Sequence, residues 1–330
     1  MSLDLLPTYE DGVEVWNLSP SQMSMYKNCA RSWELYYVDG IGKERSTKSF
    51  FEIGNYFHEL MHVYYHVIRE GQTPGSEFVL NYMMSRMRRD FENITDEKQI
   101  HTISIVTRLV SDYVSRWSPI LDKGIIVEGV ENKLKVPVKT PGGNEVVLHC
   151  ITDLLYRTSN GKLTTRDHKT GQANSWHQSM LPLENQLLFN SAAYYLKTGE
   201  MPLRVEISYI NSYDYKTKIP SLKERFQNFV YTHNEQSILN YIQEIYKFID
   251  TTIETKHFAR SYSKDCSRCQ FNGICTEEIR GLSIEPIIRS QYSRIERDYE
   301  VRLKHKSAVP QQTIKSSAGD KESFSLSLNL

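Results

Sequence analysis

The chain has no excess of charge of either sign. Its 330 residues include 40 Lys and Arg and 40 Asp and Glu, so the formal net charge at pH 7 is +0. A neutral total neither supports nor excludes binding to nucleic acid, because such binding depends on where cations cluster. The function must therefore be inferred from local motifs.

Long apolar runs and a secretion signal are also missing. The segment Met1–Pro7 has no basic stretch before an apolar one, and no later segment approaches membrane-spanning length. We therefore expect a soluble, intracellular and cytoplasmic protein without a membrane partner. Cysteine is scarce, and five is an odd number, so no disulfide framework is expected in that compartment.

The segment Arg166–Gly171 carries the densest set of reactive side chains. It follows Gly161 and an extended run of Leu and Thr, which predicts a strand whose last residues enter a site. Asp167 and Lys169 are two residues apart, so on a strand they point to the same face. A metal-binding carboxylate would then lie beside an ammonium group.

A second acid, Asp153, lies in the preceding predicted strand, and the two strands would form a hairpin around Ser159–Gly161. Asp153 and Asp167 could then meet across this hairpin. Two converging carboxylates suit Mg²⁺ or Mn²⁺, and a neighbouring Lys can orient water or stabilise a pentacovalent phosphate. The pattern predicts metal-assisted phosphodiester hydrolysis, although acids and Lys ending a hairpin are, on their own, more often solvated surface.

Two helices are predicted before these strands. The sequence Ser-Pro-Ser-Gln at residues 19–22 supplies an N-cap, a Pro at the first helical position and a capping-box Gln. A helix should therefore run over about residues 20–37, with Cys29 inside it. A second helix is predicted over residues 51–70, stopped by Gly71.

The second helix carries an ambiguous motif. Gly54 and His58 lie one turn apart, so the small residue could admit a large group beside the imidazole. His58, Glu59 and His62 also match H-E-x-x-H, the zinc protease signature, in which two His hold zinc and the Glu activates water. The plain alternative is an amphipathic helix whose His residues border a core.

The rest of the chain predicts a mixed sheet flanked by helices. Residues 76–121 are helical in pattern, and Glu131 projects from the strands that follow and could join the metal site. Predicted strands cover residues 125–128, 132–138, 145–153, 163–169 and 204–212, and predicted helices cover residues 183–196, with Gln186, and 235–255.

Aromatic and basic residues cluster after the last predicted strand. Tyr209, Tyr213 and Tyr215, with Lys216 and Lys218, could stack bases and hold phosphates of a single strand. Aromatics at strand spacing are more often packing residues.

Three cysteines have the spacing of a metal site. Cys266, Cys269 and Cys275 form C-x2-C-x5-C in a loop that contains Gly, and three thiolates call for a fourth ligand. The candidates for that ligand are Cys29, Cys150 and His257. Spacing alone does not separate an iron–sulfur cluster from zinc, because both accept four thiolates.

Taken together, these motifs resemble those of a known family. The segments Gly54–His58, Ile151–Asp153, Asp167–Gly171 and Gln186–Leu188 fall in the order found in RecB-type PD-(D/E)XK nucleases. Cys29 with Cys266, Cys269 and Cys275 is similar to the subgroup that carries a four-cysteine [4Fe-4S] cluster, which includes the AddB nuclease domain and CRISPR-associated RecB-like exonucleases. The resemblance covers about residues 18–280.

The resemblance implies a role for each matching residue. His58, Asp153 and Asp167 would bind the metal with the His168 carbonyl, while Lys169 would position the attacking water and Gln186 would orient the site. The four cysteines would join the N- and C-terminal parts of the domain around the cluster. Two positions depart from the family pattern: Cys150 replaces a usual Gly, which suggests a packing residue, and Asn190 replaces a frequent Tyr.

The expected architecture is an α/β restriction-endonuclease-like core with a helical N-terminal insertion and an iron–sulfur clasp. We expect an irregular arm over residues 1–18 and one nuclease domain over residues 19–304. Its parts would be helices at 51–122, a sheet core at 124–255 and the cysteine loop at 266–275. Residues 276–304 are helical in pattern, and residues 305–330 read as a disordered tail whose alternating end could add a strand to a protein partner.

The predicted function is a deoxyribonuclease of DNA repair or recombination, acting as an exonuclease on DNA ends or single strands with Mn²⁺ or Mg²⁺. Two alternatives remain, a zinc protease and a DNA-binding subunit without catalysis.

Overall fold

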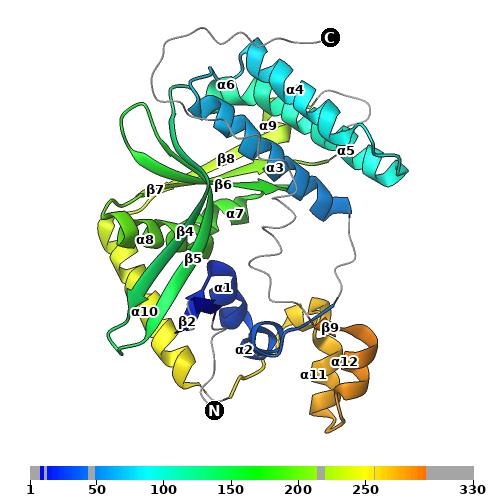
Figure 1. Ribbon diagram of the computed structural model, residues 1–330, viewed down its shortest axis with the longest axis vertical. Coiled ribbons are helices and arrows are strands. Elements are labelled where there is room, and N and C mark those ends of the chain that lie inside the picture. Colours follow the sequence, from blue (N-terminus) through cyan, green and yellow to red (C-terminus); the bar gives the residue numbers. More distant parts are fainter. Residues whose placement is uncertain (1–7, 11–12, 44–48, 214–219, 256, 295–330) are drawn as a thin grey trace.

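The centre of the molecule is a mixed sheet of seven strands. The computed structural model describes residues 8–10, 13–43, 49–213, 220–255 and 257–294 (Figure 1). The strands are β1 (Thr8–Glu10), β2 (Val13–Leu18), β4 (Ile126–Lys139), β5 (Glu145–Arg157), β6 (Leu163–Thr170), β7 (Arg204–Ile210) and β8 (Phe226–Thr232). The mixed sheet flanked by helices is as predicted, although β8 was missed.

Strand β5 organises the sheet. β4 pairs antiparallel with β5 along most of its length. On the other edge of β5, β2 pairs in parallel with residues 146–148, and β6 pairs antiparallel with residues 154–157. β6 then runs parallel to β7, and β7 antiparallel to β8. Between residues 148 and 154, β5 has no strand partner on the side that β2 and β6 share. Asp153 lies in this gap.

Helices cover the sheet in two groups (Figure 1). The first contains α3 (Ser49–Arg69), α4 (Glu77–Phe91), α5 (Glu97–Asp112), the π-helical turn Tyr113–Trp117 and α6 (Ser118–Leu121). The second contains α7 (Ser175–Met180), the 3₁₀ turn Leu181–Leu183, α8 (Asn185–Thr198) and α10 (Glu235–Glu254), and the short α9 (Leu222–Arg225) precedes β8. Among the described residues, no helix is long and apolar enough to cross a bilayer.

The two helical groups form two separate hydrophobic cores on the β4–β5 hairpin. The first group packs on Val130 and Leu154, while α8 and α10 pack on Leu134 and Leu148. The boundary between the cores therefore falls near the middle of both strands, where the candidate site lies.

The N-terminal segment differs from its prediction. Where the sequence predicted an irregular arm, β2 joins the central sheet by pairing with β5. The Ser19 hydroxyl caps α1 (Pro20–Asn28) as expected, by accepting a hydrogen bond from the Gln22 backbone N–H. The single helix expected over residues 20–37 is interrupted at Cys29, whose backbone is extended (φ −163°, ψ 108°), so that α2 (Ala30–Trp33) and the π-helical turn Glu34–Val38 follow as separate segments.

The last described segment packs against these N-terminal helices (Figure 1). It contains the 3₁₀ turn Lys264–Arg268, α11 (Asn272–Ile279), α12 (Glu285–Gln291) and β9 (Ser293–Arg294), which pairs with β3 (Ile41–Gly42). Glu278 accepts hydrogen bonds from both Arg31 and Arg260, which joins α11 to the N-terminal helices. The predicted C-terminal tail lies outside the described residues.

Candidate metal centre

Three acids lie in one row across three neighbouring strands. Val130 pairs with Leu154 and Asn132 with Thr152, so Glu131 of β4 is opposite Asp153 of β5. The β5–β6 ladder ends at the pair Leu154 and Arg166, which places Asp153 opposite Asp167 one step beyond it. Like charges facing each other across strands are destabilising unless a cation lies between them. Continued by one step, the register of this ladder brings Asp153 and Asp167 to opposite positions on the two strands.

Helix α3 brings His58 to the same place. The His58 Nδ1 atom is 3.4 Å from Asp153 Oδ2. One turn earlier, a Cβ atom on Gly54 would lie only 3.0 Å from the Thr170 hydroxyl, so glycine allows α3 to cross close to the end of β6. Glycine at position 54 thus allows α3 to lie close to β6.

Glu131 has an unusual backbone conformation. Its φ is +47°, in the left-handed region, and it is the only non-glycine residue with positive φ in the described part of the chain. Such a conformation costs about 1–2 kcal/mol and persists only where the surroundings enforce it. Here it accompanies a side chain that faces the acids and imidazole of the site.

Together these residues offer a coherent set of metal ligands. Among the described residues, one ligand atom each from His58, Glu131 and Asp153 lie within 4.8 Å of one another. Oxygen ligands with one imidazole nitrogen suit Mn²⁺ and Mg²⁺. Burial, Asp167 and Glu131 all raise the pKa of Asp153, while the His168 N–H opposes them by donating to Asp153 Oδ2 over 2.9 Å. A bound divalent cation would offset the repulsion between these neighbouring carboxylates, so the residues fit Mn²⁺ or Mg²⁺.

Asp167, Lys169 and Gln186 form a closed triangle beside this set. Lys169 Nζ is 2.9 Å from Asp167 Oδ2 and donates to Gln186 Oε1 over 3.1 Å, and Gln186 Nε2 donates to Asp167 Oδ1 over 2.9 Å. Burial lowers the pKa of Lys169, but Asp167 outweighs it, so the pKa is raised and the amine stays charged. Asp167 is not one of the three clustered ligand residues, because the triangle holds its carboxylate.

A buried ionic network supports the strand that carries Asp167. The Arg166 guanidinium is fully buried and donates to Asp122 over 2.6 Å and to Glu206 over 2.8 Å. It also donates to the Tyr65 hydroxyl, whose oxygen is 3.4 Å from His168 Nε2. Burial lowers the pKa of His168, so its imidazole is neutral. This network was not predicted, because its members are scattered through the sequence with no shared motif.

The zinc protease motif does not assemble with a third ligand. His58 faces Asp153, whereas the His62 ring packs 4.6 Å from the ring of His66. Neither Glu59 nor His62 belongs to the ligand group, which is the one group of three metal-binding side chains among the described residues.

The departures from the family pattern have structural explanations. Cys150 packs in the core beneath α8 and α10, where burial raises the pKa of its thiol to about 12. It is a packing residue, as the sequence suggested. Asn190 of α8 donates to the Ile151 carbonyl, in the part of β5 next to Asp153 that is paired with β4 on one side only.

The four predicted cluster cysteines lie toward the same end of the molecule, but no three of their sulfur atoms are close together. The Arg31 N–H donates to the Ala259 carbonyl, which brings the segment after Cys29 against the segment before Cys266. In the described part of the chain, no three thiols lie within 4.8 Å of one another. A tetrahedral zinc site would place its sulfur atoms about 3.8 Å apart, from Zn–S bonds of about 2.3 Å. The thiols therefore do not fit a closed zinc site, and this geometry does not assign an iron–sulfur cluster.

One family of known proteins matches most of the chain. A model of the PD-(D/E)XK nuclease superfamily matches residues 17–276, without selecting the iron–sulfur subgroup. No curated protein matches the sequence. The crystal structure of SSO0001 is similar at 15% sequence identity and a TM-score of 0.29, over 60% of this chain and 94% of that one. Because the family match extends over most of the 330 residues and includes all three acid-bearing strands, the chain belongs to the PD-(D/E)XK nuclease superfamily.

Proposed function

We propose that this protein is a metal-dependent deoxyribonuclease that works as an exonuclease on DNA ends or single strands, in DNA repair or recombination. One observation carries the proposal. His58, Glu131 and Asp153 present ligand atoms within 4.8 Å of one another, next to a charged lysine, in a chain of a nuclease superfamily.

In this proposal His58, Glu131 and Asp153 would hold Mn²⁺ or Mg²⁺, and Asp167 of the Lys169–Gln186 triangle would be a further ligand. When bound, the cation would polarise the phosphodiester and lower the pKa of a water molecule. The imidazole makes Mn²⁺ the preferred ion. The His168 carbonyl is a further proposed ligand.

Lys169 and Gln186 have different proposed roles. Because the Lys169 amine stays charged, it donates hydrogen bonds and stabilises negative charge that develops on the phosphate, and it does not abstract a proton. Gln186 is a positioning residue that orients the Asp167 carboxylate and the Lys169 ammonium. The neutral His168 keeps the Asp153 carboxylate in place through its backbone N–H.

We also propose that Cys29, Cys266, Cys269 and Cys275 bind a structural [4Fe-4S] cluster. The support is the C-x2-C-x5-C spacing together with the contacts that bring the segments around Cys29 and Cys266 to the same end of the molecule. A cluster spaces its thiolates more widely than a single zinc ion does. Anaerobically purified protein should absorb broadly near about 400 nm. A colourless protein without iron would refute this part alone.

The nuclease is tested by cleavage of linear DNA with Mn²⁺, Mg²⁺ or a chelator. Wild-type protein should cut only with metal, and His58→Ala and Lys169→Ala should each lower kcat by at least about 100-fold. His62→Ala is the matched control one turn away on the same helix, and it should retain activity. Equal losses in His58→Ala and His62→Ala would favour the zinc protease, and metal-dependent cutting that survives Lys169→Ala would refute the proposed site. Wild-type protein that binds DNA without cutting it would favour the DNA-binding subunit.

A further inference from the structure

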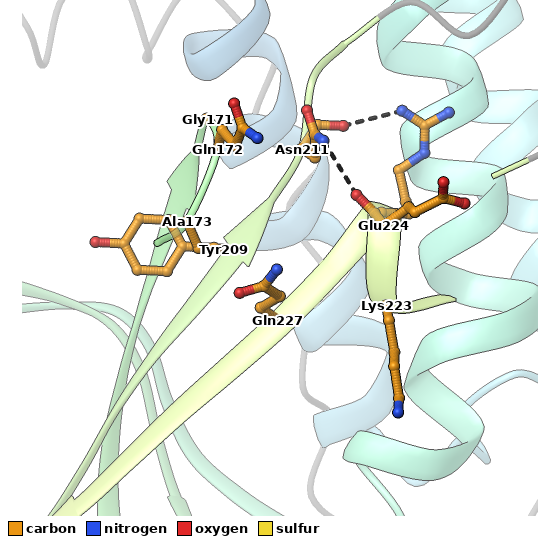
Figure 2. Close-up of a pocket in the computed structure, with 9 residues that line it drawn as sticks. Gly171, Gln172, Ala173, Tyr209, Asn211, Lys223, Glu224 and Gln227 are labelled. Atoms are coloured by element: carbon orange, nitrogen blue, oxygen red, sulfur yellow. Dashed lines mark hydrogen bonds between the residues drawn. The ribbon is translucent and has the colours of Figure 1, made fainter. Parts of the chain in front are cut away.

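A second concave site lies beside the candidate metal centre. It is a cavity of about 240 Å³ at the ends of β6, β7 and β8 (Figure 2). Its lining residues are Gly171, Gln172, Ala173, Tyr209, Asn211, Lys223, Glu224, Arg225 and Gln227. Pockets for drug-sized ligands occupy about 300–1,000 Å³, so this one suits a single ring system more than a whole nucleotide.

The sheet connects this cavity to the metal centre. Lys169 pairs with Tyr209 on β7, and Tyr209 pairs with Gln227 on β8, so the three side chains form one cross-strand row. Strands lie about 4.8 Å apart, which places Gln227 about 10 Å from Lys169. A nucleotide whose phosphate contacts Lys169 can reach that far with its base. Burial and Glu184 raise the pKa of Tyr209, and Lys169 lowers it, as expected for a side chain close to these charges.

The far wall of the cavity is preorganised by hydrogen bonds within the protein. Arg225 is almost fully buried and donates to the Asn211 and Tyr213 carbonyls, while its Nε lies 3.3 Å from Asp112. The Asn211 amide in turn donates to the Glu224 carbonyl over 3.0 Å (Figure 2). The wall therefore needs no ordering when a ligand binds, which lowers the entropic cost of binding.

The chemistry of the lining matches a neutral ring with both donors and acceptors. Lys223 and Glu224 balance each other in charge, and Arg225 is paired with Asp112, so the lining offers little net positive charge to a phosphate. Figure 2 shows the Gln227 side chain between the Tyr209 backbone on one side and Lys223 with Glu224 on the other, with the Tyr209 ring directed away from Gln227 and Gln172 drawn next to Gly171. Gln side chains offer a donor and an acceptor together, the pattern that recognises base edges, and a tyrosine ring supplies a stacking surface.

We propose that this cavity binds the base of an unpaired nucleotide next to the scissile phosphate, with Gln172 and Gln227 on the base edge and Tyr209 beside its ring. The inference rests on the proposed nuclease and narrows its substrate. In a duplex the partner base occupies the Watson–Crick edge and stacking encloses the faces, so a base can enter only from a single strand or a frayed end. The cavity thus makes an unpaired end the preferred substrate.

The test uses linear DNA with a single-stranded overhang, in which an abasic residue replaces each nucleotide in turn. Wild-type protein should show a drop of about tenfold in kcat/KM when the abasic residue lies at one position flanking the cleaved bond, and little change elsewhere. The double variant Gln172→Ala/Gln227→Ala should cut intact DNA about tenfold more slowly, with no further loss on the abasic substrate. Gln178→Ala, on nearby α7 and outside the cavity lining, should keep the wild-type pattern.

Three outcomes would overturn the inference. If abasic and intact substrates are cut equally by wild-type protein, or if the variant and abasic losses add, the cavity does not bind the base while the nuclease stands. If wild-type protein cuts no DNA with any metal, the nuclease fails and the inference fails with it. Gln172→Ala alone changes one exposed residue, so a thermal unfolding curve like that of wild type together with a partial loss separates recognition from misfolding.

Discussion

Replacing Glu131 by glycine should separate the stability of the protein from its metal binding. The residue has φ +47°, a conformation that costs an L-residue about 1–2 kcal/mol and glycine almost nothing. Glycine within a strand loses about 0.5–1 kcal/mol through chain entropy. The net effect of Glu131→Gly is a gain between roughly zero and 1.5 kcal/mol in the free energy of unfolding without metal. Removing an acid opposite Asp153 acts in the same direction.

The matched control is Lys133→Gly, two residues further along β4 on an exposed side chain. Its φ is not positive, so it should lose about 1 kcal/mol. For 330 residues at about 2.1 cal/mol/K per residue, the unfolding entropy is roughly 0.7 kcal/mol/K. A loss of about 1 kcal/mol therefore lowers Tm by about 1.5 °C. Glu131→Gly should not show this fall.

Metal should narrow the difference in Tm between the two variants by about 2 °C. With Mn²⁺ at about 100 times its Kd, binding stabilises by about 2.7 kcal/mol, which raises Tm by about 4 °C for wild type and Lys133→Gly. If the loss of Glu131 weakens binding tenfold, the same Mn²⁺ concentration raises Tm by only about 2 °C. Differential scanning calorimetry with chelator and with Mn²⁺ measures the Tm of each of the two variants with and without metal. A variant Glu131→Gly that loses stability like Lys133→Gly and keeps the full Mn²⁺ shift would refute both the backbone strain and the ligand role.

Three further predictions concern the support of the site and the contact between α11 and the N-terminal helices. Gly54→Val should push α3 away from Thr170 and reduce kcat by more than about tenfold with little change in helix content by circular dichroism; full activity would show that the close crossing is dispensable. Asp122→Asn should leave the buried Arg166 short of a charge partner and lower the free energy of unfolding by about 3–5 kcal/mol in chemical denaturation; a loss under about 1 kcal/mol would contradict this. Burial raises the pKa of Glu278, but hydrogen bonds and charge from Arg31 and Arg260 outweigh burial, so the pKa is lowered. The ionised Glu278 therefore stabilises the folded protein fully above pH 4.5, and this contribution is lost as the pH falls through the lowered pKa. Glu278→Gln should flatten the fall in Tm below that pH, and an unchanged profile would exclude this contribution.

The parts of the fold that were predictable from sequence depend on local signals. The β5–β6 hairpin follows from its turn at residues 159–161 and from period-two strands, and its register brings Asp153 opposite Asp167. The start of α1 follows from the Ser19 cap. In each case the deciding residues lie within a few positions of one another, so pattern and structure agree.

Features that the sequence did not predict depend on contacts between distant segments. β2 is a strand because β5 offers it an edge about 130 residues later, as the pairing of Trp16 with Val146 shows. The sequence gives no sign that Arg166 is buried, and it is buried because Tyr65 and Asp122, 101 and 44 residues away, enclose it. The left-handed backbone of Glu131 likewise has no local signature.

The position of the metal centre follows from which neighbouring strands pair with each part of β5. A carboxylate at the middle of a fully paired strand would face neighbouring backbone groups and side chains and leave no room for substrate. On β5 the pairing with β2 ends at residue 148 and the pairing with β6 begins at residue 154, so the strand is open on one side where Asp153 lies. The two hydrophobic cores meet at the same place, which leaves it polar while both sides stay rigid. A shift of β6 by one residue against β5 would move Asp167 out of the row and exchange the faces of its side chains. The register of this hairpin therefore sets both the stability of the sheet and the geometry of the acids.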